Sequence, residues 1–128
     1  MYKILIVEDD NTIAERLASP LKKWNYKTVC VRDFKNVMEE FKKTDPQLVI
    51  LDIGLPFYNG FYWCQEIRKL SNVPIIFLSS MNDNMNIVMA MNMGGDEFII
   101  ILAHRQIMML QKILDDIRTL FSKPWMLK

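Results

Sequence analysis

The sequence has few of the side chains that build thiolate, imidazole or triad chemistry. It contains two cysteines and one histidine among its 128 residues. Cys30 and Cys64 lie far apart, and neither has a second ligand pair beside it, which excludes a zinc site and a redox CxxC motif. A reduced, cytoplasmic chain is the simplest interpretation. His104 has no cysteine or serine nucleophile in its sequence context, so we do not expect a hydrolase triad.

An excess of charge of one sign and a long apolar run are also missing. Sixteen basic residues against fifteen acidic ones leave a net charge of +1, which gives no electrostatic reason to expect binding to nucleic acid or to a membrane surface. No apolar run approaches the roughly 20 residues that span a bilayer, and too few apolar residues follow Lys3 for a signal peptide. With 51% hydrophobic and 24% charged residues, the composition predicts one globular domain.

Strand-like and helix-like segments alternate along the chain. Apolar runs predict strands at residues 3–7, 26–31, 48–51 and 73–78, and within residues 96–102. Apolar residues at helical spacing predict a helix after each of the five strands. The first helix is predicted to be capped by Asn11 or Thr12, the second by Asp33, and the third to begin after Gly60. The last two are predicted over about 84–93 and about 105–121.

Strict alternation predicts an α/β fold with a doubly wound parallel sheet of five strands and five helices. Pro20 lies inside the first helical pattern and should kink or weaken that helix near its end. We interpret residues 1–121 as the domain. Residues 122–128 have no pattern and are interpreted as a linker stub or an expression tail.

Asp52 stands at the most informative position of the chain. It follows the apolar run 48–51, which is typical of a strand buried on both faces of a parallel sheet, and Gly54 with Pro56 predicts a turn directly afterwards. A carboxylate at the carboxyl end of a central strand lies where open α/β sheets bind their ligands. An arbitrary Asp in such a place most often caps a turn, so its role here depends on the side chains around it.

Oxygen-bearing side chains end three of the predicted strands. Glu8 and Asp9 follow the first strand, Asp52 the third and Ser79 the fourth. In the flavodoxin-like strand order 2-1-3-4-5, the first and third strands are neighbours, so the three carboxylates should converge. Carboxylates that close repel one another, so either one is protonated or a cation lies among them. Hard oxygen ligands suit Mg²⁺ or Mn²⁺.

A metal bound by Asp9 and Asp52 could also hold a phosphoryl oxygen beside Asp52. This arrangement favours in-line attack of the Asp52 carboxylate on a phosphorylated donor and formation of an aspartyl phosphate. Ser79 would donate a hydrogen bond to the phosphoryl oxygens. Each of these residues alone would be taken for part of a solvated loop, and their joint placement carries the hypothesis.

Five segments carry motifs that are weak singly and specific together: Ile4–Asp10, Leu51–Pro56, Asn59–Gly60, Pro74–Ser80 and Gly94–Phe98. Through them, residues 1–100 resemble the receiver domain of bacterial two-component response regulators. The resemblance implies that Asp52 is the phosphoacceptor and that Glu8 and Asp9 form the acidic pair. It also implies that Mg²⁺ is bound in addition by the main-chain carbonyl of Gly54.

Further expectations follow from the same resemblance. Ser79 corresponds to the switch hydroxyl, and Phe98 to the aromatic residue that turns inward on activation. The implied function is a signalling domain that accepts a phosphoryl group from a sensor histidine kinase, catalyses at most its own phosphorylation and dephosphorylation, and is not otherwise an enzyme. Within the family, the chain resembles the winged-helix class of regulators and, more loosely, the regulators of peptide-antibiotic (bacitracin-type) sensing systems. They dimerise through helix 4, strand 5 and helix 5 and bind DNA only through a C-terminal domain, which is expected to be absent from this chain.

The chain departs from the family pattern after the fifth predicted strand. Ile101 stands where the family has a lysine, and Leu102 where it has a proline. Loss of the lysine removes a positive charge from an acidic pocket, which should strengthen the need for Mg²⁺ and weaken signal relay. A degenerate receiver that binds or dimerises without phosphorylation is therefore an alternative.

Two other functions are disfavoured by the sequence. A phosphatase with an aspartyl nucleophile would need a second Asp at position 54, where this chain has glycine, and a flavin phosphate would be repelled by the acids at 8–10.

Overall fold

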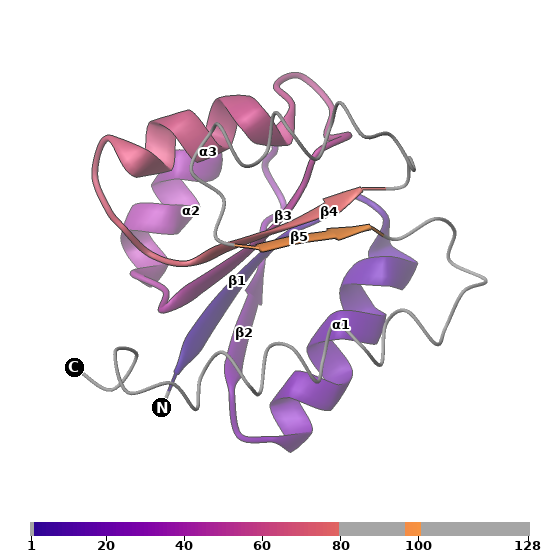
Figure 1. Cartoon of the computed structure of the whole chain (residues 1–128). Helices are drawn as coiled ribbons and strands as arrows, with labels where there is room; N and C mark the ends of the chain where they lie inside the picture. The colour runs from indigo at the N-terminus through magenta and orange to yellow at the C-terminus, as the bar shows by residue number, and fades with distance from the viewer. Residues whose placement is uncertain (1, 80–96, 101–128) are drawn as a thin grey trace.

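The computed structural model describes residues 2–79 and 97–100, in which strands and helices alternate (Figure 1). The strands are β1 (Lys3–Val7), β2 (Lys27–Cys30), β3 (Leu48–Asp52), β4 (Ile75–Ser79) and β5 (Glu97–Ile100). The helices are α1 (Asn11–Lys23), α2 (Val37–Thr44) and α3 (Gly60–Arg68). The helices predicted over about 84–93 and 105–121 lie outside the described residues. No helix in the described part of the chain is long and apolar enough to cross a membrane.

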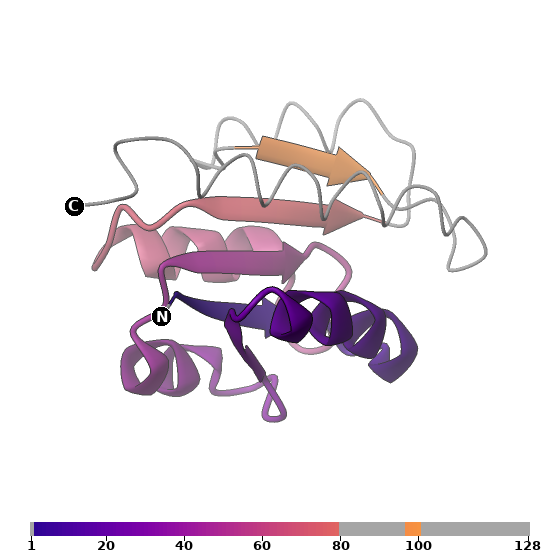
Figure 2. The same cartoon turned by 90° about the horizontal axis from the view of Figure 1, so that it is seen from below.

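The strands form a parallel sheet in the order β2-β1-β3-β4-β5. Their register pairs Ile6 with Ile50 and Leu51 with Phe77. Figure 2 shows β1, β3, β4 and β5 in this order across the sheet, and the arrowheads of β3, β4 and β5 point the same way. The predicted α/β class with a parallel sheet is therefore confirmed. The carboxyl ends of β1 and β3 are neighbours at one edge.

Two apolar layers cover the two faces of the sheet. Figure 1 shows α1 on one face and α2 with α3 on the other. Because side chains alternate along a strand, Ile4 and Ile6 pack with α1, whereas Leu5 and Val7 pack with the residues of α2 and α3. This burial on both faces explains why the central strands read as continuous apolar runs. Cys30 and Cys64 are free thiols, and Cys64 is packed in the second layer.

Three local predictions need correction. The cap of α1 is Asp10 and neither Asn11 nor Thr12, because its Oδ1 accepts hydrogen bonds from the N–H groups of Thr12 (2.9 Å) and Ile13 (3.3 Å). Asp33 does not cap α2. Its carboxylate closes a turn by accepting from Lys35 N and Asn36 Nδ2, and the helix begins only at residue 37. The second strand is shorter than predicted, at residues 27–30.

Pro20 does not end α1. The helix continues for three residues past the proline, to Lys23, and the N–H of Trp24 still bonds to the Pro20 carbonyl (3.2 Å). Proline removes one helical hydrogen bond, but Leu17 and Leu21 are fully buried against the sheet, so tertiary packing holds the last turn.

Candidate functional site

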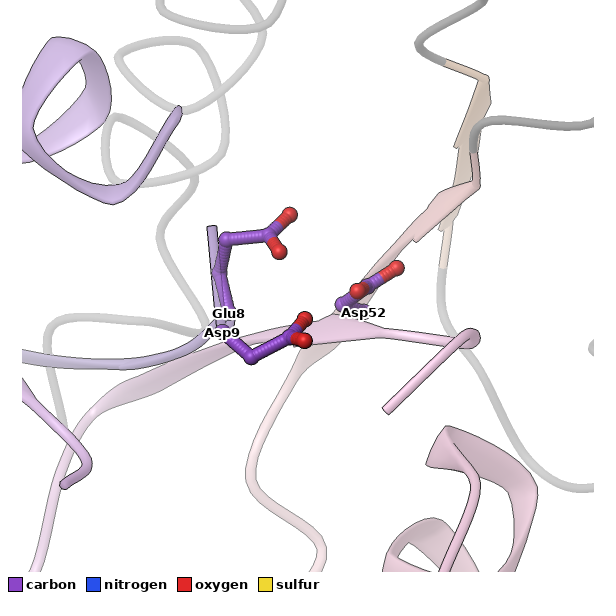
Figure 3. A group of neighbouring side chains, drawn as sticks. All are labelled: Glu8, Asp9 and Asp52. Carbon is purple, nitrogen blue, oxygen red and sulfur yellow. The ribbon is translucent and has the colours of Figure 1, made fainter. Parts of the chain in front are cut away.

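Three carboxylates meet at the carboxyl edge of the sheet (Figure 3). Glu8 and Asp9 directly follow β1, and Asp52 is the last residue of β3. Because β1 and β3 are paired neighbours, the three side chains come together, and one ligand oxygen from each lies within 4.8 Å of the others. The convergence expected from the sequence is thus present in the structure.

Two of these acids are buried. Glu8 is 6% exposed and Asp52 is 9% exposed, whereas Asp9 faces solvent. Main-chain donors hold both buried carboxylates: Asp10 N donates to Glu8 Oε2 (3.1 Å), and Gly54 N donates to Asp52 Oδ1 (3.2 Å). One hydrogen bond from the backbone satisfies only part of the acceptor capacity of an ionised carboxylate. The cluster therefore has oxygen lone pairs available for a further partner.

The electrostatics of the cluster favour the uptake of positive charge. Burial first, and the negative charge of Asp52 second, raise the pKa of Glu8 to about 8, against the opposing effect of the Asp10 N–H. Burial also raises the pKa of Asp52, while the hydrogen bond from Gly54 lowers it. Near neutral pH the three acids together therefore retain a proton unless a cation enters.

The donor set fits a small hard cation. Carboxylate oxygens at this spacing, with Asp9 exposed on the open side, match the ligands that Mg²⁺ prefers and leave room for bound water. Gly54 is exposed two residues after Asp52, and its N–H donates to Asp52 Oδ1, so its main-chain carbonyl belongs to the same turn. A divalent ion here would neutralise the repulsion that adds to burial in raising the pKa values of Glu8 and Asp52.

The other predicted site residues are described only through their main chain. Ser79 ends β4 and pairs with Ile100, one residue beyond the pair formed by Asp52 and Leu78, so it stands at the same edge of the sheet. Phe98 lies in β5 and pairs with Phe77 of β4. Their side-chain roles stay predictions. Ile101 and Leu102, on which the departure from the family pattern rests, lie outside the described residues.

Sequence reasoning missed two features of this edge. Asp10 was read only as part of an acidic run, yet it caps α1 and its N–H holds Glu8. The signal for the cap is an Asp directly before a helical pattern. Gly60 was read as a loop residue before a helix, yet it is the buried first residue of α3, close to the main chain of Asp52. This close approach has no signal in a single sequence beyond the glycine itself.

Comparison with known proteins agrees with this geometry. A family model described as the response regulator receiver domain matches residues 4–115. The response regulator protein GraR of Staphylococcus epidermidis is 50% identical over 96 residues, which are 75% of this chain and 43% of that protein. The transcriptional regulatory protein YvcP of Bacillus subtilis, described as uncharacterized, is 46% identical over 109 residues, which are 85% of this chain and 46% of that protein. The chain thus spans less than half the length of these curated relatives.

Solved structures show the same similarity. The N-terminal domain of the nisin resistance regulator NsrR, described as a lantibiotic response regulator, superposes with a TM-score of 0.80 at 42% identity, covering 96% of this chain and 99% of that one. The BeF3-activated N-terminal receiver domain of Klebsiella pneumoniae RstA has a TM-score of 0.75 at 28% identity, covering 88% and 96%.

Proposed function

The chain belongs to the response regulator receiver domain family, and from this premise we propose that it accepts a phosphoryl group on Asp52 from the phosphohistidine of a sensor histidine kinase. Receiver domains are signalling domains of two-component systems, with phosphorylation and Mg²⁺ as family features. The observation that carries the proposal is the convergence of Glu8, Asp9 and Asp52 within 4.8 Å at the edge where β1 and β3 end.

The residues present can perform the transfer. One oxygen of Asp52 accepts a hydrogen bond from the Gly54 N–H, and the other would attack the phosphorus atom of the donor. A P–O bond to Asp52 forms, the P–N bond to the donor imidazole breaks, and the released nitrogen keeps the electron pair and is neutralised by a proton. Glu8, Asp9, Asp52 and the Gly54 carbonyl would bind Mg²⁺ or Mn²⁺, which would neutralise charge on the phosphoryl oxygens.

The proposal extends to the response that follows phosphorylation. Ser79 would donate a hydrogen bond to the phosphoryl oxygens, and Phe98 would turn inward as the switch aromatic. The complete architecture would have five strands and five helices over residues 1–121. Dimerisation would use the fourth and fifth predicted helices, about 84–93 and about 105–121, together with β5 between them. DNA binding would belong to a C-terminal domain outside this chain, in a cytoplasmic regulator of transcription. The resemblance to a lantibiotic response regulator supports a peptide antibiotic as the class of signal.

A second function is favoured by one sequence observation. Ile101 occupies the position of the family's lysine, which pairs with the phosphoacceptor and then with the phosphoryl group. A receiver without that cation could serve as a dimerisation or binding module whose assembly does not depend on phosphorylation. Oligomer size with and without beryllofluoride separates the two functions: a switch changes size with the mimic, and a constitutive module does not.

The direct test is labelling by a radioactive small phosphodonor such as acetyl phosphate. We expect wild-type protein to be labelled in the presence of Mg²⁺ and not in EDTA. Asp52→Asn removes the nucleophilic oxygen while keeping the shape of the side chain, so labelling should disappear. Asp45→Asn is the matched control, since Asp45 is exposed after α2 and should leave labelling unchanged. Label that persists in Asp52→Asn would contradict the proposal.

A further inference from the structure

Gly60, the first residue of α3, lies against the main chain of Asp52. A Cβ atom built at position 60 would overlap the carbonyl oxygen of Asp52 and lie 2.9 Å from Ile53 Cα. Real Cβ atoms essentially never approach other atoms this closely. The neighbours are backbone atoms, so they cannot rotate aside as the end of a flexible side chain could. A side chain at position 60 therefore requires a shift of the main chain.

The requirement for glycine here is spatial and not conformational. Gly60 is a helical residue whose φ lies outside the left-handed region, so every L-amino acid could adopt its backbone angles. Alanine also has the higher helix propensity. Helix formation alone would thus favour alanine at this position, and any loss of function on that substitution must come from the close approach to Asp52 and Ile53.

The contact closes a loop that begins at the phosphorylation site. Gly60 N donates to the carbonyl of Ile53 (3.0 Å), and Ile53 N in turn donates to the carbonyl of Leu78 in β4 (2.9 Å). Gly54 lies inside the loop that this hydrogen bond closes, and its N–H donates to Asp52 Oδ1. The start of α3 is thereby attached to the turn that carries both the carboxylate and the proposed carbonyl ligand.

The strand cannot yield easily to an added methyl group. β3 is paired with β1 on one side and β4 on the other, and all five of its residues are buried. The parts that can move are the start of α3 and the 53–59 loop, including the Gly54 turn. A displacement of about 1 Å at such a site is enough to reduce transfer strongly, because attack depends on the alignment of the reacting atoms.

We propose that Gly60 is a positioning residue for phosphorylation: the absence of its side chain lets α3 begin against β3 and holds the Asp52–Gly54 turn in the geometry that binds the metal and presents the carboxylate. This inference rests on the proposed function of Asp52. It assigns to the start of α3 a role in the site, although Gly60 contributes no atom that touches the phosphoryl group.

The test compares Gly60→Ala with Ile67→Ala. Ile67 is fully buried on the same helix, and its apolar side chain cannot hydrogen-bond to the Asp52–Gly54 turn. Its truncation therefore loosens α3 from the core without adding an atom at the site. The measurements are the Mg²⁺ dissociation constant by calorimetry, the rate of labelling by acetyl phosphate, and the thermal midpoint. We expect Gly60→Ala to weaken Mg²⁺ binding and to slow labelling at saturating Mg²⁺ by tenfold or more. Ile67→Ala should stay within twofold in both, even with an equal or larger loss of thermal midpoint.

The outcomes separate this inference from the proposed function. Wild-type protein without Mg²⁺-dependent labelling would overturn the function itself. Labelled wild type together with Gly60→Ala within twofold of it, or with Ile67→Ala impaired equally, would overturn only the positioning role.

A second pair of variants applies if Gly60→Ala does not fold. Asn59 caps α3 by accepting from Tyr62 N (3.0 Å), so Asn59→Ala frees the start of the helix without a clash. It should weaken Mg²⁺ binding two- to fivefold, and Asn59→Ser, which can still cap, should restore it. Mg²⁺ binding in Asn59→Ala equal to that of wild type would contradict the positioning role.

Discussion

The bodies of β1 and β3 and their carboxyl ends are almost equally buried and have opposite chemistry. Ile6, Ile50 and Leu51 are fully buried in apolar layers, and Glu8 and Asp52, next in line along the same strands, are 6% and 9% exposed. Burial stabilises the first group by removing apolar surface from water. The same burial destabilises the charged form of the second group. The strands therefore combine a region that maintains the fold with a region that opposes it and can bind a cation.

The largest effect should follow from damage to the apolar region. Leu51 is fully buried one residue before Asp52, between β1 and β4 in the sheet. Leu51→Ala removes buried methyl groups and leaves a cavity, so we expect it to lower the free energy of unfolding by about 2–5 kcal/mol. Urea unfolding followed by circular dichroism measures this. A loss below about 1 kcal/mol would mean that the layer beside the site collapses around the gap and is not closely packed.

A smaller effect on the free energy of unfolding should come from pH, through the buried carboxyl group of Glu8 at the strand end. In metal-free protein the pKa of Glu8 is raised to about 8, whereas in the unfolded chain it returns to about 4.5. Between these values the unfolded chain has released its proton and the folded protein has not, so the free energy of unfolding falls as the pH rises from about 4.5 to 8 and then levels off. Allowing for solvent at the open side of the cluster, we expect this contribution to be about 2–3 kcal/mol.

Urea unfolding in EDTA at pH 5, 6, 7 and 8 checks this dependence. Glu8→Gln is the matched control, because an amide keeps the shape of the side chain and cannot titrate, so this part of the slope should vanish. Saturating Mg²⁺ should also reduce the slope in wild-type protein, since the ion binds the ionised form of the cluster. A slope that is unchanged in Glu8→Gln would show that other groups cause it.

The smallest effect concerns the residue that links the two regions. Asp10 caps α1, whose apolar side packs on the strand bodies, and its N–H holds Glu8 at their ends. Asp10→Ala keeps the N–H and removes the cap, so we expect it to lower the free energy of unfolding by about 1 kcal/mol and to leave Mg²⁺ binding within twofold. Asp10→Ser should recover most of the stability. Loss of Mg²⁺ binding as large as that of stability would mean that the cap also orients Glu8.

Much of this molecule could be predicted because burial and strand periodicity leave local signals. Continuous apolar runs at 3–7 and 48–51 indicated doubly covered strands, and acids directly after them indicated a site at their shared edge. The cap of α1, the start of α2 and the length of β2 were predicted wrongly. Asp33 closes a turn with Asn36 where a cap was expected, and short polar side chains satisfy a turn as readily as a helix start.

The sequence alone determined the fold class, the acidic residues at the strand ends and the family resemblance, because hydrophobic periodicity and motif spacing are properties of the linear chain. Only the tertiary structure decided how the acids interact. Pairing of β1 with β3 brings one oxygen of each of the three acids within 4.8 Å of the others and buries the side chains of Glu8 and Asp52. This burial, together with the charge of Asp52, raises the pKa of Glu8 to about 8. It also decided that Gly60 has no room for a side chain, because that contact joins a helix to a strand end and depends on how the two elements pack in space.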